Sequence, residues 1–172
     1  KTDNTWFTLL TMNTHPMHFD DEYAKETTDY ELKNNDILIT MTGTKNKRDF
    51  CFTVKIKNKD LLKKQIYLNQ RVGALRFNPL NNHTFINSIL KTNTLLDALF
   101  LQSTGSANQA NLGKIAILKT ILPLPPLPEQ KVIVQKIAQL MAFCDALQVE
   151  IEQKEGKTLE WMESSMQAVL AQ

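Results

Sequence analysis

LPLPPLPEQKVIV, at residues 122–134, separates two parts of the sequence that have different periodicities. Four of the six residues from Pro123 to Pro128 are prolines, which lack the backbone donor that a helix interior or a central strand requires. Pro128 and Glu129 suit the first turn of a helix, where a missing N–H costs nothing and a carboxylate faces the positive end of the helix dipole. We therefore expect a domain over residues 1–122, a proline-rich linker at 123–128 and a helix over 129–172.

After the prolines, apolar residues recur alternately every four and every three positions. This spacing is a heptad seam, and it is formed by Ile133, Ile137, Leu140, Cys144, Leu147 and Ile151. The phase breaks near Gly156 and resumes on a shifted face, which fits a kink, a stutter or a short second helix. A continuous helix over 129–170 would be about 60 Å long. Its apolar edge predicts a coiled coil with another helix.

The sequence before the prolines contains both strand and helix patterns. Short β-branched or alternating apolar runs predict strands at 36–43, 50–56, 65–68, 71–77 and 114–122. The period changes over 81–101 to that of one or two amphipathic helices, with Asn82 or Thr84 near the N-cap. A polar loop is expected at 102–113. The order predicts an α+β protein, with a mixed β-sheet and flanking helices followed by the long C-terminal coiled-coil helix.

Positive charge is concentrated in the middle of the chain. Residues 37–128 carry 13 Lys and Arg against 3 Asp, whereas residues 1–36 carry 3 Lys against 8 acids and residues 129–172 carry 4 Lys against 7 acids. A basic folded segment is typical of a surface that binds phosphates, because neutralising them releases condensed counterions. Solvated surface lysines are the alternative interpretation.

Side chains able to read DNA bases cluster in three parts of this basic segment. Arg can bind guanine bidentately, Asn and Gln can do the same to adenine, and Lys binds phosphates as a point charge. The candidate nucleic-acid-binding residues are Lys45, Lys47, Arg48, Arg71, Arg76, Asn108, Gln109 and Asn111.

Catalytic and cofactor motifs are not found in the sequence. None of its five glycines forms a phosphate or dinucleotide loop, so we expect no cofactor. His15 and His18 lie close together, but their spacing alone is weak evidence for a metal, and we expect none. Cys51 and Cys144 form no CxxC pattern and are expected to be reduced packing residues. We therefore expect a non-catalytic protein.

No apolar stretch approaches the roughly 20 uninterrupted residues of a membrane span, and the first residues lack the apolar centre of a signal peptide. We therefore expect a cytoplasmic protein without membrane contact.

Four stretches resemble the specificity subunits of type I restriction-modification enzymes. Residues 32–43 are similar to the family's "kGDILIsrtG" strand, with Asn35 in place of the usual glycine. Residues 68–76, 105–112 and 122–134 resemble its "lnQrv..lr" segment, its "GsaqpnL" loop and its "iPLPPLaEQkrIv" entry to the conserved spacer helix. The stretches follow one another in the family's order.

The resemblance implies a DNA-specificity subunit whose target-recognition domain reads one half of a bipartite site. It also implies adenine methyltransferase subunits that dock on the spacer helix, and a translocase-nuclease subunit in the full complex. The chain would supply one half of such a subunit, as a natural half or an excised piece, and would pair through its helix with a second copy or a second half-subunit. The N-terminal edge of its sheet is expected to be incomplete.

Two other functions fit parts of the sequence. The prolines at 123–128 could be a ligand for an adaptor domain, which would make the chain a protein-interaction module with a coiled-coil tail. A DNA-binding regulator without a methyltransferase is the other. Salt-dependent duplex binding distinguishes the first, and co-purification with a methyltransferase distinguishes the second.

Overall fold

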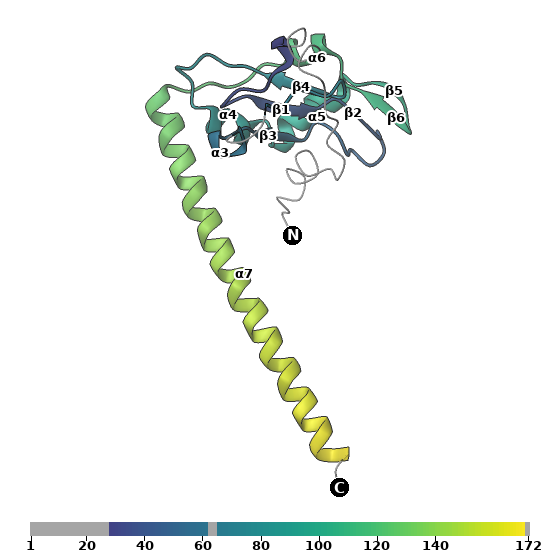
Figure 1. The fold of residues 1–172 in the computed structure, drawn as a ribbon, viewed down its shortest axis with the longest axis vertical. Helices are drawn as coiled ribbons and strands as arrows, with labels where there is room; N and C mark the ends of the chain where they lie inside the picture. Colours follow the sequence, from purple (N-terminus) through teal and green to yellow (C-terminus); the bar gives the residue numbers. More distant parts are fainter. Residues whose placement is uncertain (1–27, 62–64, 171–172) are drawn as a thin grey trace. The chain divides into compact units, whose positions relative to one another are not determined.

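The computed structural model describes residues 28–61 and 65–170 of the 172-residue chain. It contains two compact units, Lys1–Leu127 and Pro128–Gln172. The first unit holds all the strands of the described residues and several short helices, and the second is a single long helix (Figure 1). The expected α+β class with a long C-terminal helix is confirmed.

A three-stranded antiparallel sheet lies at the centre of the first unit. Its middle strand is β1 (Ile37–Thr40), with β3 (Thr53–Lys55) on one side and β4 (Val72–Leu75) on the other. Leu38 is opposite both Val54 and Ala74, so these three side chains share one face of the sheet. Ile37 and Ile39 belong to the other face and are fully buried.

A second, smaller sheet continues from the end of β1. It has the order β2 (Thr42–Gly43), β6 (Gln109–Asn111) and β5 (Thr104–Ser106), again antiparallel. Met41 joins the two sheets, because its N–H donates to the carbonyl oxygen of Arg71 at 2.9 Å and its own oxygen accepts from the N–H of Leu112 at 2.7 Å. The β part is thus two antiparallel sheets rather than one mixed sheet.

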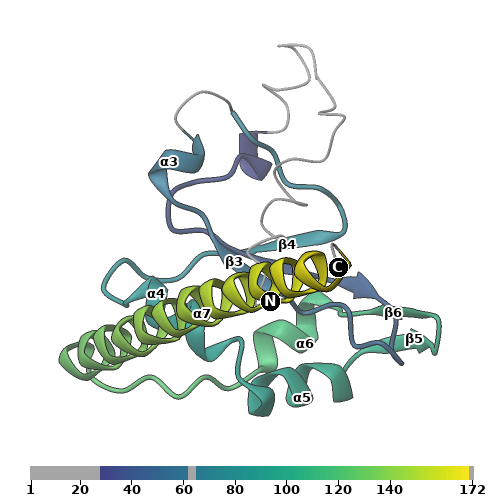
Figure 2. The same ribbon diagram turned by 90° about the horizontal axis from the view of Figure 1, so that it is seen from below.

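Short helices flank the central sheet. They are η1 (Thr28–Tyr30), α3 (Asn58–Leu61), α4 (His83–Ile89), α5 (Asn93–Leu101) and α6 (Lys114–Lys119). The side chain of Asn82, one of the two cap candidates in the sequence, caps α4 by accepting from the N–H groups of Thr84 and Phe85. Figure 2 shows α3 on one side of β3 and β4, and α5 and α6 on the other.

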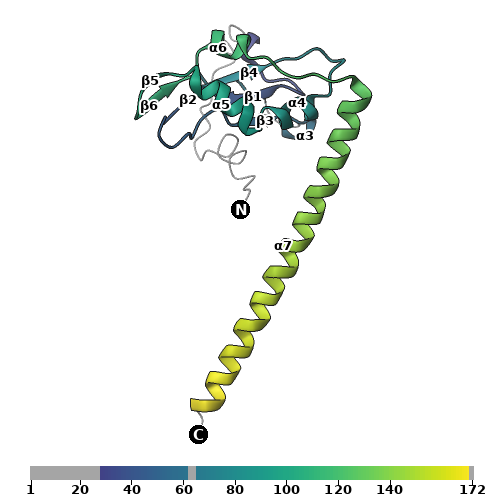
Figure 3. The same cartoon turned by 180° about the vertical axis from the view of Figure 1, so that it is seen from behind.

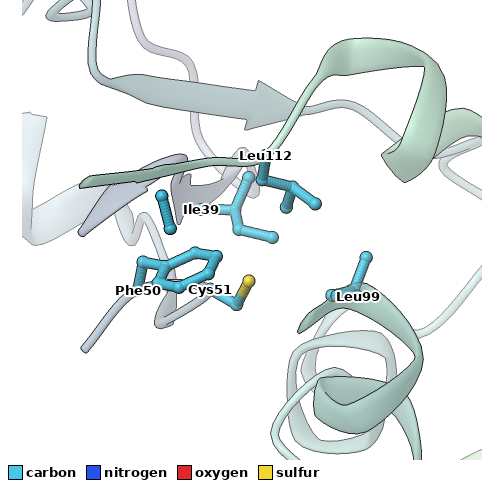
Figure 4. Close-up of a cluster of buried hydrophobic side chains, with 6 residues drawn as sticks. Ile39, Phe50, Cys51, Leu99 and Leu112 are labelled. Carbon is cyan, nitrogen blue, oxygen red and sulfur yellow. The ribbon is translucent and has the colours of Figure 1, made fainter. Parts of the chain in front are cut away.

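The main core lies between the two sheets and α5. Its buried members are Ile39, Phe50, Cys51, Leu99, Ala110 and Leu112 (Figure 4). The ring of Phe50 meets that of Phe100 edge to face, with centroids 4.9 Å apart. A second cluster of Leu32, Leu38 and Ile56 covers the opposite face of the central sheet.

Two local predictions about this core were wrong. Residues 114–119 form the helix α6 instead of a strand, with Ala116 and Ile117 packed on the core while Ile115 and Leu118 are exposed. A short apolar run is compatible with the period of a strand or of a helix. Here the helical period places Ala116 and Ile117 against the core. The alternating strand at 50–56 is shortened to Thr53–Lys55 because Cys51, with φ of 63°, turns the chain so that both Phe50 and Cys51 are buried.

The turn before β1 explains a departure from the family pattern. Asn35, which stands where the family usually has glycine, has φ of 70°. Asn is among the few other residues that enter this left-handed region at modest cost. Its N–H donates to the carbonyl oxygen of Ile56 at 3.0 Å, which holds the turn against the end of β3.

The second unit is the helix α7 (Leu127–Leu170). Its 44 residues correspond to about 66 Å. The helix runs through Gly156 without interruption, which excludes a kink into two helices and leaves the stutter. After Ile151 the next apolar residue of the pattern is Leu159, a spacing equal to two successive steps of four, which locally unwinds a coiled coil.

Within the described residues, α7 is the one helix long and apolar enough to cross a membrane, judged by length and composition alone. A single helix of this kind is weak evidence for a membrane span. Polar residues such as Gln135, Lys136 and Asp145 interrupt its apolar stretch, and the heptad seam already accounts for its apolar content.

Candidate nucleic-acid interface

The turn at residues 45–48 contains three of the candidate DNA-binding side chains. It follows β2 directly, and the N–H of Lys45 donates to the carbonyl oxygen of Ala107 at 3.0 Å. The ammonium of Lys45 also reaches the carbonyl oxygen of Ser103 at 3.3 Å. Asp49 accepts from the N–H of Thr44 and closes the turn from inside. These bonds fix the turn against the hairpin formed by β5 and β6.

That hairpin is the segment expected to be a polar loop. Strands β5 and β6 are joined by a two-residue turn at Ala107 and Asn108. Ala110 and Leu112 are buried, whereas Asn108, Gln109 and Asn111 are exposed. Gly105 has φ of 99°, and a Cβ on it would lie 2.1 Å from the carbonyl oxygen of Gln109. Only glycine therefore allows this close approach of the two strands.

Arg48 is held by two groups of the helix α5. Its guanidinium pairs with the carboxylate of Asp97 and lies over the ring of Phe100, with Cζ 4.2 Å from the ring centroid. The side chains of Arg48 and Asp97 are about half exposed, at 52% and 56%. The φ of Arg48 is 51°, a left-handed value that costs a non-glycine residue of the order of 1 kcal/mol. In this left-handed backbone conformation the side chain of Arg48 contacts Asp97 and Phe100 of α5.

Lys47 lies between these anchored residues and is exposed. Within the part of the chain that the structure describes, no hydrogen bond or ion pair engages its ammonium group. A solvated lysine at the end of a fixed turn can contact a phosphate without first breaking a bond in the protein.

Arg71 lies at the end of the central sheet that is nearest to the hairpin. It precedes β4, and its backbone oxygen accepts from Met41, the residue that joins the two sheets. Its N–H donates to the side chain of Asn69 at 3.0 Å, which forms a local turn. The residue is exposed.

Arg76 lies at the opposite end of β4. Its Nε donates to both carboxylate oxygens of Asp36, at 3.1 and 3.3 Å, and its Nη2 donates to the carbonyl oxygen of Glu31 at 2.7 Å. The hydrogen bond with Asp36 raises the pKa of Arg76 above its ordinary value. The side chain of Asp36 is only 4% exposed. This geometry gives Arg76 a structural role in holding the start of β1 to the end of β4.

The structure thus brings together six of the eight candidates on one edge of the first unit. The turn supplies Lys45, Lys47 and Arg48, and the hairpin supplies Asn108, Gln109 and Asn111. Figures 1 and 3 show the strands β2, β5 and β6 of this region side by side at one end of the first unit. Arg71 belongs to the neighbouring sheet end, and Arg76 lies about 17 Å of strand further on at about 3.4 Å per residue. We refer to residues 45–48 and 104–111 together as the turn–hairpin edge.

Asp97, Phe100 and Asp36 were missed as partners of the candidate arginines. Asp97 is 49 residues from Arg48 in the sequence, and Asp36 is 40 residues from Arg76. No local pattern signals such pairs. For Asp97 the sequence held one clue. The basic segment over 37–128 has only three acids, so each of them is a candidate partner for a nearby cation.

No cluster of three or more His, Cys, Asp or Glu side chains that could hold a metal occurs in the described ranges 28–61 and 65–170. His15 and His18 lie outside these ranges. Cys51 is buried, and desolvation raises the pKa of its thiol to about 12, which makes it a packing residue as expected. Cys144 is exposed on α7.

The heptad residues of α7 remain accessible in the single chain. Ile137, Leu140, Leu147 and Ile151 are between 38% and 56% exposed. Exposed apolar side chains in a continuous stripe mark a surface that another molecule covers. The stripe is the second candidate interface of the chain.

The chain is similar in sequence to known proteins. The sequence model of the type I restriction modification DNA specificity domain matches residues 1–155. The specificity subunit of the type I restriction enzyme EcoBI from Escherichia coli is 27% identical to this chain over 126 residues, which are 72% of the chain. They are 23% of that subunit, so the chain spans less than a quarter of the length of this relative.

Proposed function

The chain belongs to the family of type I restriction modification DNA specificity domains, and from this premise we propose that it reads one half of a bipartite DNA site. We further propose that its C-terminal helix pairs with a second helix and docks adenine methyltransferase subunits. The observation that supports the DNA-reading part is the gathering of six candidate DNA-binding side chains on the turn–hairpin edge.

The chemistry of the turn–hairpin edge suits double-stranded DNA. Lys45 and Lys47 supply positive charge for phosphates, which fixes the position of a protein on the duplex. The candidate amides are those of Asn108, Gln109 and Asn111. Each can bind an adenine, because its N–H donates to N7 of the base and its oxygen accepts from the exocyclic N6 amine. A two-stranded ribbon is also a shape that the major groove admits. Arg71 would extend this surface along the neighbouring sheet end.

The heptad stripe of α7 supports pairing with a second copy or a second half-subunit. Charge favours an antiparallel arrangement. Residues 129–144 carry two Lys and one Glu, whereas residues 145–170 carry two Lys and six acids. Antiparallel helices place the less acidic half of one against the acidic half of the other, and parallel helices place the two acidic halves together. Two-fold pairing would match an inverted repeat with an unread gap.

The methyltransferase is the proposed source of the chemistry. The sequence has no catalytic or cofactor motif of its own, and the family is named for DNA specificity. A translocase-nuclease subunit would join for cleavage. Both partners are inferred from the family relationship. They are proposals for this chain because it covers only part of its relative.

Fluorescence anisotropy with a mixed-sequence 30-base-pair duplex tests the DNA-reading function. The full chain should bind, and the logarithm of the affinity should fall linearly with the logarithm of salt concentration. Methylated adenines mapped in cells that carry the chain with its methyltransferase should then define an interrupted site. A chain that fails to bind duplex DNA at low salt would contradict the proposal, and duplex binding without association with a methyltransferase would favour a DNA-binding regulator.

A further inference from the structure

The ion pair between Arg48 and Asp97 places a carboxylate on the turn–hairpin edge, where DNA phosphates would approach. The side chain of Asp97 is 56% exposed, so water could solvate its carboxylate and burial does not force it to have a partner. The basic segment over 37–128 contains only three acids. Asp49 closes the turn by accepting from Thr44, and Asp60 caps α3 by accepting from the N–H of Lys57 at 2.8 Å. Within the residues that the structure describes, Asp97 is the one of these three acids that pairs with a candidate DNA-binding side chain.

The contacts of Arg48 define how its guanidinium is presented. The guanidinium lies over the ring of Phe100, and that ring packs edge to face against the fully buried Phe50. Asp97 occupies the guanidinium through Nη2. The guanidinium has five N–H donors, so one carboxylate oxygen leaves donors available on its other edge. Arg48 is therefore oriented in advance but is partly neutralised.

We propose that Asp97 is a specificity-determining residue that acts through Arg48. In the unbound chain its carboxylate partly neutralises the guanidinium and repels an approaching phosphate, so an arbitrary phosphate contact gains little. A ligand that matches the second edge of the guanidinium, such as the O6 and N7 atoms of a guanine, can bind while Phe100 and Asp97 keep the group in place. Asp97 thus lowers affinity for arbitrary DNA more than for the matched site. The inference rests on the proposed DNA-reading function and adds a residue to it.

The substitution Asp97→Asn tests this role, because it removes the charge and keeps the shape and one acceptor oxygen. Two duplexes are needed: one selected by the wild-type chain from a randomised pool, and one of the same composition in shuffled order. Asp97→Asn should bind the shuffled duplex about fivefold more tightly, which is the upper range for an exposed ion pair. Its salt dependence should steepen by about 0.9, as one further phosphate is neutralised. The preference for the selected duplex should fall by a similar factor.

Asp60→Asn is the matched control. It removes the same charge from α3, which lies away from the turn–hairpin edge in all three views of the fold (Figures 1, 2 and 3). It should leave both affinities within about twofold, since exposed charges beyond a Debye length are screened. An equal gain in Asp60→Asn would reduce the effect of Asp97 to net charge and overturn the proposal.

The double variant Arg48→Ala with Asp97→Asn shows whether Asp97 acts through Arg48. In the Arg48→Ala background, Asp97→Asn should no longer change the preference between the duplexes. A preference unchanged by Asp97→Asn in the wild-type background, or the same change in both backgrounds, would overturn the inference while DNA binding by the wild type stands. If the wild-type chain binds neither duplex and selects no sequence, the proposed function fails instead, and this inference fails with it.

Discussion

The guanidinium of Arg76 grips the nearly buried carboxylate of Asp36 through Nε, at 3.1 and 3.3 Å, and through Nη2 at 3.2 Å. Asp36 also accepts from the N–H of Lys33 at 2.9 Å. Together these bonds fix the turn that leads into β1, the central strand of the domain. An arginine that the sequence offered as a DNA reader is thus a structural link in the fold.

Arg76→Ala should lower the free energy of unfolding by about 2 kcal/mol, because it leaves the carboxylate of Asp36 buried with a single donor. The partial exposure of Arg76 keeps the loss below that of a fully buried pair. Urea unfolding followed by circular dichroism measures it. Arg71→Ala is the control, since this exposed arginine has no such carboxylate partner in the described part of the chain. Equal stability of Arg76→Ala and the wild type would remove the structural role.

Lys47→Ala should weaken binding to a mixed-sequence duplex several-fold and reduce the slope of its salt dependence by about 0.9, as expected for the loss of one phosphate contact. Lys59→Ala removes the same charge from α3 and should change neither value appreciably. Anisotropy titrations at four salt concentrations give both quantities. Indistinguishable results for the two variants would mean that Lys47 does not face the DNA.

Gly105→Ala should disrupt the β5–β6 hairpin, because the added Cβ would lie 2.1 Å from the backbone oxygen of Gln109 at a φ of 99°. We expect a stability loss above about 1 kcal/mol together with weaker duplex binding. Gly113→Ala provides the comparison, since a Cβ there meets nothing within 4 Å and its φ is −74°. If both variants bind DNA like the wild type, the hairpin is not part of the reading surface.

Leu140→Lys should dissociate the paired chains, because it places a charge in the middle of the heptad seam. Val149→Lys introduces the same charge at an exposed position outside the seam and should leave the assembly intact. Sedimentation velocity at tens of micromolar distinguishes the two. A wild-type chain that sediments as a monomer at this concentration would contradict self-pairing through α7.

The two cysteines should differ in their reaction with a thiol reagent at pH 8. Cys144 is exposed on the seam and should react quickly in dilute protein, then more slowly as concentration rises and helices pair. Cys51 should react only on unfolding, because burial raises its pKa to about 12 and blocks access. A rate for Cys144 that does not vary with concentration would argue against a partner on this face.

The same thiol sets a pH dependence of stability. Folded Cys51 keeps its proton while the unfolded thiol ionises near its ordinary pKa of 9.0, so the folded state binds more protons above that pH. Its contribution to stability is therefore complete below about pH 9 and declines as pH rises toward about 12. Replacing Cys51 with Ala should flatten this decline in urea unfolding midpoints measured between pH 8 and 11.

The features that the sequence predicted correctly are those written in neighbouring residues. The long helix, its start at the prolines and a cap at one of the two candidates, Asn82, each depend on residues within one or two turns. The family could be identified for the same reason, since its motifs are short and follow in order. The run at 114–119 failed because an apolar stretch of this length fits either period, and only packing of Ala116 and Ile117 on the core selects the helix.

The partners of the charged side chains were decided by the tertiary structure alone. Asp36 and Asp97 meet Arg76 and Arg48 across 40 and 49 residues, where strand pairing and helix packing bring distant segments together. The sequence by itself determined that the chain has a basic α+β domain followed by a long helix with an apolar heptad seam. Which arginine links two strands and which lies on the turn–hairpin edge followed only from the folded contacts, because a guanidinium is the same group in either place.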